Sequence, residues 1–137
     1  MKVFEYAFQV LENHLDTFGH VNNATYLQLY ETARWDFITA NGFGLERIRR
    51  ELRGPVILEA NVKFKRELVN REVITILSQS REVVNSKIMT IHQEMRRADG
   101  KAASEALFTV GFMDLKERKL VAPPEDWLAA CGYVEPK

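Results

Sequence analysis

The sequence has a single cysteine, no long run of apolar residues and no excess of charge of either sign. One thiol, Cys131, excludes an internal disulfide, and a charged, alternating N-terminal segment stands where a signal peptide would be, so we expect a cytoplasmic protein. Every apolar run is far shorter than the roughly 18 residues that a membrane-spanning helix needs. The 19 Lys and Arg residues balance 19 Asp and Glu residues, so no overall field attracts nucleic acid. A small anionic ligand with a local basic groove remains compatible with this composition.

Motifs of metal and cofactor chemistry are missing as well. There is no GxxxxGK phosphate loop, no GxGxxG turn and no HExxH run, and the 3 histidines are not spaced as metal ligands. We therefore expect no metal and no cofactor. The 137 residues, 46% hydrophobic and 28% charged, are typical of a globular chain, and we expect one domain over residues 1–137.

Hydrophobic periodicity predicts one long helix among strands. Period-two alternation over residues 3–10 predicts a first strand, and apolar residues at helical spacing predict a helix from about Asn23 to Ala40. Short helices are expected over residues 45–52 and after Pro124. Four further strands are expected over residues 56–65, 72–81, 86–96 and 102–113.

The connections between these elements complete the predicted fold. Gly54-Pro55 is expected to break the chain before the next strand, and Asp99-Gly100 to form a type I′ hairpin turn. The order of elements predicts an α+β fold in which the long helix lies on the concave side of a curved antiparallel sheet. Trp35 falls on the polar arc of that helix, which indicates a partner surface.

The segment before the long helix concentrates reactive side chains. It holds one carboxylate, two imidazoles and two amides, which belong to His14, Asp16, His20, Asn22 and Asn23. Unpaired N–H groups in the first helical turn can stabilise an oxyanion. A carboxylate folded back to that point can attack a thioester carbonyl or deprotonate a water. Asp16 is therefore the candidate catalytic residue, and its structural alternative is a turn former.

The run from Asp16 to Tyr26, followed by Glu31 and Arg34, resembles the hotdog-fold acyl-CoA thioesterases of the 4-hydroxybenzoyl-CoA type. His20-Val21-Asn22-Asn23 and Ala33-Arg34-Trp35-Asp36 are still more similar to the bacterial long-chain acyl-CoA thioesterases, and the similarity extends over nearly the whole chain. The resemblance implies a hotdog fold, a curved antiparallel sheet wrapped around one long central helix. It also implies hydrolysis of acyl-CoA thioesters to free acid and CoA, with Asp16 as nucleophile or general base and the amide of Asn23 polarising the carbonyl.

Two departures from the family pattern bear on His20. Several relatives have a second aspartate where this chain has His14, and plant acyl carrier protein thioesterases have an asparagine where it has Phe18. The equivalent of His20 is catalytic in the plant type and is not a histidine in the 4-hydroxybenzoyl-CoA type. His20 is therefore expected to be an auxiliary catalytic residue or a structural histidine that hydrogen-bonds the loop.

The expected substrate-binding residues are Asn22, Tyr26, Lys65 and Arg66. The acyl chain would run alongside the helix near Tyr26 and Tyr30. Lys65 and Arg66 belong to a basic strip that either contacts CoA phosphates or forms a solvated face. The side chain of Asn22 or Asn23 is also expected to cap the helix.

The remaining expectations concern partners and rival functions. Glu31 and Arg34 are expected to form an ion pair on the helix. A sheet with open edges is expected to pair into a homodimer or homotetramer, with Trp35 and the C-terminal helix as interface candidates. The substrate would be an acyl-CoA or acyl carrier protein thioester. A non-catalytic acyl-CoA-binding sensor and an enoyl-thioester hydratase remain alternatives.

Overall fold

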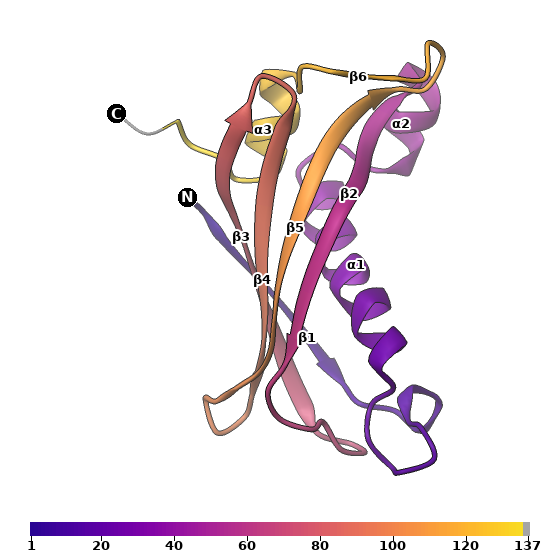
Figure 1. Cartoon of the computed structure of the whole chain (residues 1–137), viewed down its shortest axis with the longest axis vertical. Coiled ribbons are helices and arrows are strands. Elements are labelled where there is room, and N and C mark those ends of the chain that lie inside the picture. The colour runs from indigo at the N-terminus through magenta and orange to yellow at the C-terminus, as the bar shows by residue number, and fades with distance from the viewer. Residues whose placement is uncertain (136–137) are drawn as a thin grey trace.

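The protein is built on a curved antiparallel sheet, shown by a computed structural model that describes residues 1–135 (Figure 1). The strand order is β1-β3-β4-β5-β2, and β6 pairs with β5. The strands are β1 Val3–Gln9, β2 Arg53–Phe64, β3 Val73–Asn85, β4 Ile88–Arg97, β5 Ala102–Asp114 and β6 Lys119–Val121. The helices are the 3₁₀ helix η1 Glu12–His14, α1 Asn23–Ala40, α2 Leu45–Glu51 and α3 Glu125–Ala130.

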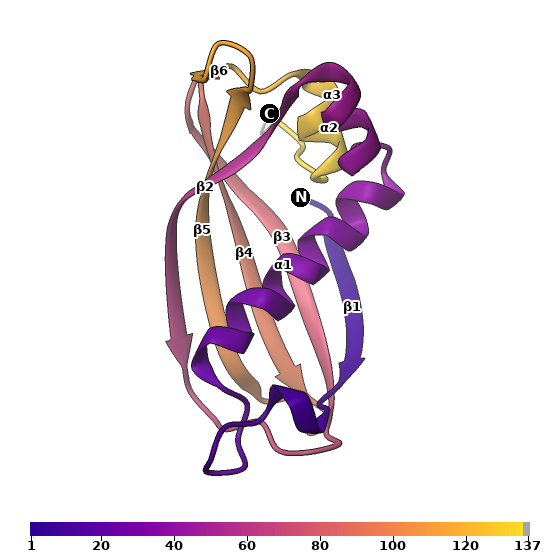
Figure 2. The ribbon, with the colours of Figure 1, turned by 90° about the vertical axis from the view of Figure 1, so that its right-hand side faces the viewer.

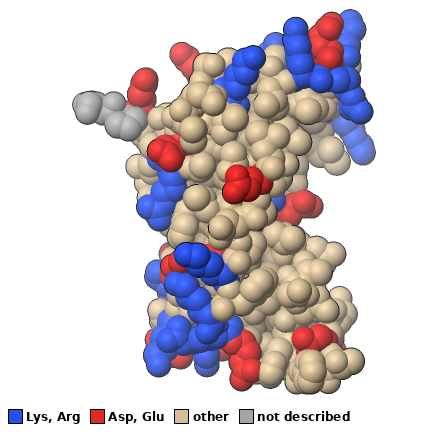
Figure 3. Space-filling view, in the orientation of Figure 1, with Lys and Arg blue, Asp and Glu red and all other residues tan. Residues whose placement is uncertain are grey.

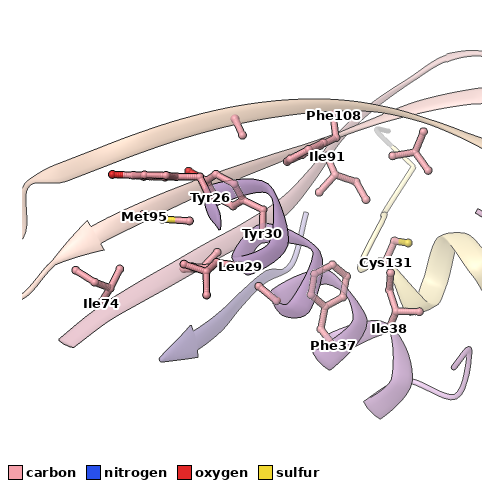
Figure 4. Packing of buried hydrophobic residues seen from close by; sticks show 14 of the residues in the cluster. Tyr26, Leu29, Tyr30, Phe37, Ile38, Ile74, Ile91, Met95, Phe108 and Cys131 are labelled. Atoms are coloured by element: carbon pink, nitrogen blue, oxygen red, sulfur yellow. The ribbon is translucent and has the colours of Figure 1, made fainter. Parts of the chain in front are cut away.

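Helix α1 lies across the concave side of the sheet, as predicted (Figures 1 and 2). The strands arch over the helix, and Leu29, Tyr30 and Phe37 lie buried between helix and sheet (Figure 4). Burial of each such side chain contributes about 1.5–3 kcal/mol, so packing on the sheet is what stabilises α1. Phe37 also stacks on Phe4 of β1, with ring centroids 4.4 Å apart. Among residues 1–135 no helix combines the length and the apolar character needed to cross a membrane.

The observed bounds of α1 match the prediction because the sequence encodes a capping residue at the start of the helix and a stop at its end. Asn22 is the N-cap, and its side chain accepts the N–H of Ala24 at 2.9 Å. At the other end the N–H of Asn41 donates to Phe37 O at 3.0 Å, and the chain then leaves the helix. The α+β architecture predicted from the order of elements is confirmed.

The turn at Asp99-Gly100 differs from the predicted type I′ turn. That turn needs positive φ at both central residues, but only Gly100, at φ 84°, has it. Gly100 N–H donates to Arg97 O at 2.9 Å and Arg97 N–H to Lys101 O at 2.9 Å, the pattern of a type I turn followed by a left-handed glycine. Asp99 stabilises this turn by accepting the N–H of Lys101 at 2.9 Å.

Strand β2 differs from its prediction in two ways. Gly54-Pro55 does not break the chain but lies inside β2, where an edge strand tolerates the missing N–H of proline. The predicted alternation is interrupted by a bulge between Ile57 and Glu59. Leu58 and Phe64 are 45% and 54% exposed, so the apolar side chains of β2 are not all buried within the chain.

Helix α1 bears on two predictions about single residues and corrects the second. Trp35 is half-buried and packs against the core, and its role at a partner surface stays a prediction. Arg34 is buried but forms no ion pair with Glu31 among the described residues. Its Nη1 donates instead to Gln93 Oε1 at 2.9 Å, and its guanidinium lies 4.2 Å from the ring centroid of Phe108.

Candidate active site

The loop between η1 and α1 turns tightly at Asp16. Asp16 Oδ1 accepts the N–H groups of Phe18 at 2.8 Å and His20 at 3.3 Å. Gly19 adopts φ +80°, a left-handed conformation that glycine enters at little cost. Asp16 is therefore a turn former, as its structural alternative predicted. Its second carboxylate oxygen, Oδ2, forms no hydrogen bond or ion pair with the residues that the structure describes, so this oxygen is available for chemistry.

The start of α1 presents one free backbone donor next to this loop. The N–H of Ala24 is used, since Asn22 Oδ1 and Asn23 Oδ1 both accept it at 2.9 Å. The N–H of Asn23 has no partner within residues 1–135, and no earlier helical turn exists to supply one. Of the unpaired N–H groups expected in the first helical turn, the one at Asn23 is therefore free and the one at Ala24 is not.

Asp16 and Asn23 line one open cavity of about 360 Å³. Its walls come from the Asp16 loop, the start of α1 and the segment after β2, and consist of Asp16, His20, Val21, Asn23, Tyr26, Phe64, Lys65, Arg66 and Glu67. The structure thus brings together six of the seven residues predicted for the site. Asn22 is the exception, because its side chain caps the helix.

His20 forms its side-chain contact with Glu67, a site residue that sequence reasoning missed. His20 Nε2 lies 2.8 Å from Glu67 Oε2, whereas the carboxylate of Asp16 contacts only the backbone N–H of His20. Glu67 reaches the site because the two loops pair, with Val21 N–H donating to Leu68 O at 3.0 Å. No periodicity or motif in the sequence marks this pairing. Within the described part of the chain no cluster of three or more His, Cys, Asp or Glu side chains is placed to hold a metal ion.

The two basic residues of the cavity are held by other parts of the protein. Lys65 Nζ lies 3.0 Å from Glu105 Oε2, a contact that lowers the pKa of the Glu105 carboxyl, and Arg66 Nη1 donates to Ala102 O at 3.0 Å. Lys63, a third basic residue two positions before Lys65, lines a different cavity over β2, β4 and β5. Lys and Arg side chains gather at the end of the sheet where the β4–β5 turn lies (Figure 3). The strip therefore divides, and only Lys65 and Arg66 line the site.

Aromatic rings form the inner wall of the cavity. Tyr26 is 4% exposed and meets Phe64 edge to face, with centroids 4.9 Å apart. Burial is the main cause that raises the pKa of the Tyr26 phenol, so the group stays neutral near pH 7. One turn further along α1, Tyr30 is fully buried and donates its hydroxyl to Ser104 Oγ at 2.8 Å. The cavity therefore reaches Tyr26 but does not include Tyr30.

Comparison with known proteins shows the family of this chain. A family model described as the thioesterase-like superfamily matches residues 10–131. The long-chain acyl-CoA thioesterase FadM of Escherichia coli (strain K12) is 32% identical over 109 residues, which cover 80% of this chain and 82% of that protein.

Solved structures share the fold. YbaW of Escherichia coli, a probable thioesterase, has a TM-score of 0.80 at 29% identity, covering 92% of this chain and 94% of that one. SAV2348 of Staphylococcus aureus, solved in complex with CoA, has a TM-score of 0.88 at 18% identity, covering 96% of this chain and 82% of that one. The shared architecture is the hotdog fold that the sequence predicts.

Proposed function

Since the chain belongs to the thioesterase-like superfamily, we propose that it hydrolyses acyl-CoA thioesters to the free acid and CoA. One observation carries the proposal: Asp16 and Asn23, which have an unpaired carboxylate oxygen and an unpaired backbone N–H among the described residues, line the same cavity at the start of α1. A carboxylate that acts as base or nucleophile and a preorganised donor are the two groups that thioester hydrolysis needs. The proposed reaction requires no cofactor.

In this mechanism Asp16 acts through Oδ2, because Oδ1 holds the loop. It either attacks the thioester carbon or deprotonates a water that attacks it. In both routes a C–O bond forms, an oxyanion develops near the N–H of Asn23, and the C–S bond breaks to release CoA thiolate, which takes up a proton. After direct attack, water cleaves the acyl–Asp16 anhydride. Asn22 acts indirectly, since its cap fixes the start of α1 and with it the direction of the Asn23 N–H.

The remaining residues of the cavity have supporting roles in this proposal. Tyr26 borders the acyl group next to the reacting carbon. Lys65 and Arg66 attract the phosphates of CoA, which are strong partners for basic side chains. His20, held by Glu67, is an auxiliary group that polarises water or the departing sulfur. Because the relative FadM is a long-chain acyl-CoA thioesterase, we propose a thioester with a long acyl chain as the preferred substrate.

The test follows free-thiol release from short, long and aromatic acyl-CoA thioesters and from an acyl carrier protein thioester. Asp16→Asn keeps an Oδ1 acceptor for the loop N–H groups and removes only the charge. We expect its turnover to fall by at least about a hundredfold. Glu67→Gln removes another carboxylate from the same cavity and serves as the matched control, with an expected change below about tenfold.

Two results would contradict the proposed hydrolysis and assign another function. If the wild type binds acyl-CoA but releases no thiol, the protein is an acyl-CoA-binding module and not a hydrolase. If it consumes an enoyl-CoA and yields a hydrated thioester with no free thiol, it is a hydratase, and the contact between His20 and Glu67 becomes the first candidate for its acid–base pair.

We further propose that the chain forms a homodimer or homotetramer through β2. This strand is an edge of the sheet, and it exposes Leu58 and Phe64. Pairing two such edges would satisfy their free N–H and C=O groups and continue the sheet. Size measurement in solution tests this, and an active monomer would contradict it. Trp127 of α3 is buried within the chain, which weakens the C-terminal helix as the interface.

A further inference from the structure

A second cavity, of about 270 Å³, lies between α1 and β2. It shares no lining residue with the cavity of Asp16. Most of its wall is apolar and includes Ile38, Ile57, Ile91 and Val110. Ligand pockets usually measure about 300–1,000 Å³ and are mainly apolar with a few polar groups. This cavity lies just below that range and has the same kind of wall, so it suits only a small molecule.

The polar groups of this cavity are mainly donors. Arg34 lines it and is 7% exposed, and among residues 1–135 it makes no ion pair. One N–H group donates to the neutral amide of Gln93, and the other donors of the guanidinium have no acceptor in the described part of the protein. Trp127 lines the same cavity, and its indole Nε1 is buried without a hydrogen-bond partner in the described chain. The one carboxylate of the lining, on Glu31, is exposed and unpaired with Arg34.

A buried cation with a neutral partner is an unusual arrangement. Removing a charge from water is unfavourable unless an opposite charge or several hydrogen bonds compensate. Burial lowers the pKa of Arg34 to about 10, so the side chain remains a cation near pH 7. The ring of Phe108, 4.2 Å from the guanidinium, provides part of the compensation. An anion in the cavity would provide the rest.

We propose that this cavity binds a small carboxylate with an aliphatic body, of the short- or medium-chain fatty acid class, with its carboxylate on Arg34. The planar guanidinium matches a carboxylate in shape and can donate two parallel hydrogen bonds to it. The aliphatic body lies against the apolar wall. Binding does not depend on hydrolysis at Asp16, although a free acid is also the product proposed for that site, so occupancy would rise as product accumulates.

Tryptophan fluorescence can report binding at this site. It contains 2 tryptophans, and both Trp35 and Trp127 line the cavity. Octanoate and 1-octanol share an aliphatic body and differ in charge, so titrating each against tryptophan fluorescence separates the contribution of Arg34. For the wild type we expect saturable binding of octanoate at least about tenfold tighter than that of octanol, because a hydrogen bond to a charged group is the stronger kind.

Single substitutions test whether octanoate binds in the cavity of Arg34. Arg34→Met keeps an unbranched apolar stem and should abolish the preference for octanoate, whereas Arg81→Met, at an exposed arginine outside the lining, should keep it. Asp16→Asn should also bind octanoate as the wild type does, which separates this site from the proposed active site.

A second variant keeps the proposal testable if Arg34→Met does not fold. Ile57 pairs across the sheet with Val110, another lining residue, so Ile57→Phe places a larger ring in the cavity and should weaken both ligands. Circular dichroism checks that each variant is folded. Equal affinity of the wild type for octanoate and octanol, or unchanged octanoate binding by Ile57→Phe, would overturn the proposal.

Discussion

Gln93 on β4 joins α1 to the sheet through its fully buried side-chain amide. Its Oε1 accepts an N–H of Arg34 at 2.9 Å, and its Nε2 donates to Tyr30 O at 3.1 Å and to Ser78 Oγ at 2.9 Å. Gln93→Leu keeps most of the side-chain volume and removes all of these hydrogen bonds. The guanidinium of Arg34 then lacks a protein acceptor at a buried position.

The expected loss of stability in Gln93→Leu follows from the hydrogen-bond partners of Gln93. A hydrogen bond to a charged group contributes about 1.5–3 kcal/mol and a neutral one about 0.5–1.5 kcal/mol. The carbonyl of Tyr30 keeps its helical bond and the hydroxyl of Ser78 can rotate, so most of the loss arises at Arg34. We expect the free energy of unfolding to fall by about 3 kcal/mol. Urea titration followed by circular dichroism should show the midpoint lowered by about 1–2 M.

Two further measurements make this prediction refutable. Gln28→Leu changes an exposed glutamine of α1 and should alter the unfolding free energy by less than about 0.5 kcal/mol. A double-mutant cycle of Gln93→Leu with Arg34→Met isolates the coupling between the two side chains. A loss below about 1 kcal/mol in Gln93→Leu, or the absence of coupling, would show that this hydrogen bond does not hold α1 to the sheet.

Three other predictions concern stability. Asn22→Ala removes the cap of α1 and should reduce the unfolding free energy by about 1 kcal/mol, measured by urea titration. In Gly19→Ala the added Cβ meets no neighbouring atom, but the alanine must adopt φ +80°. The unfolding free energy should therefore fall by about 1–2 kcal/mol through backbone strain alone. An unchanged urea midpoint would contradict this. Burial, assisted by Arg81, lowers the pKa of His92, so the unfolded state takes up the proton more readily. Stability should therefore decline as the pH falls through about 6.5, and His92→Gln should decline less when unfolding is followed from about pH 7 to pH 5.

Elements whose ends are encoded locally were predictable from the sequence. The bounds of α1 coincide with the prediction because Asn22 provides the cap and the Asn41-Gly42 pair the stop. The position of Asp16 beside the start of α1 was predictable for the same reason, since a short loop connects it to Asn23. β6 was missed because three residues are too few to show a period.

Contacts between distant segments were not predictable. Arg34 was expected to pair with its helical neighbour Glu31, but its partner Gln93 lies on β4, which only the folded sheet places beside the helix. Glu67 meets His20 because two loops pair, and nothing in either loop indicates the other. One local prediction also failed, since Asp99-Gly100 fits more than one hairpin turn. A single domain over residues 1–137 and a cytoplasmic location stay predictions, and Pro136 and Lys137 lie outside the described residues.

The cavity around Asp16 joins a local turn to walls from distant parts of the chain. The turn itself rests on hydrogen bonds between residues two and four apart, which need no distant part of the chain. The N–H groups of Lys65 and Arg66 both donate to Ala103 O of β5, at 2.9 and 3.0 Å, so these walls are in place only once β5 has docked. A nascent chain that has not yet released β5 from the ribosome therefore carries the carboxylate without its cavity, and it should be inert toward the thioesters of the cell until synthesis is nearly complete.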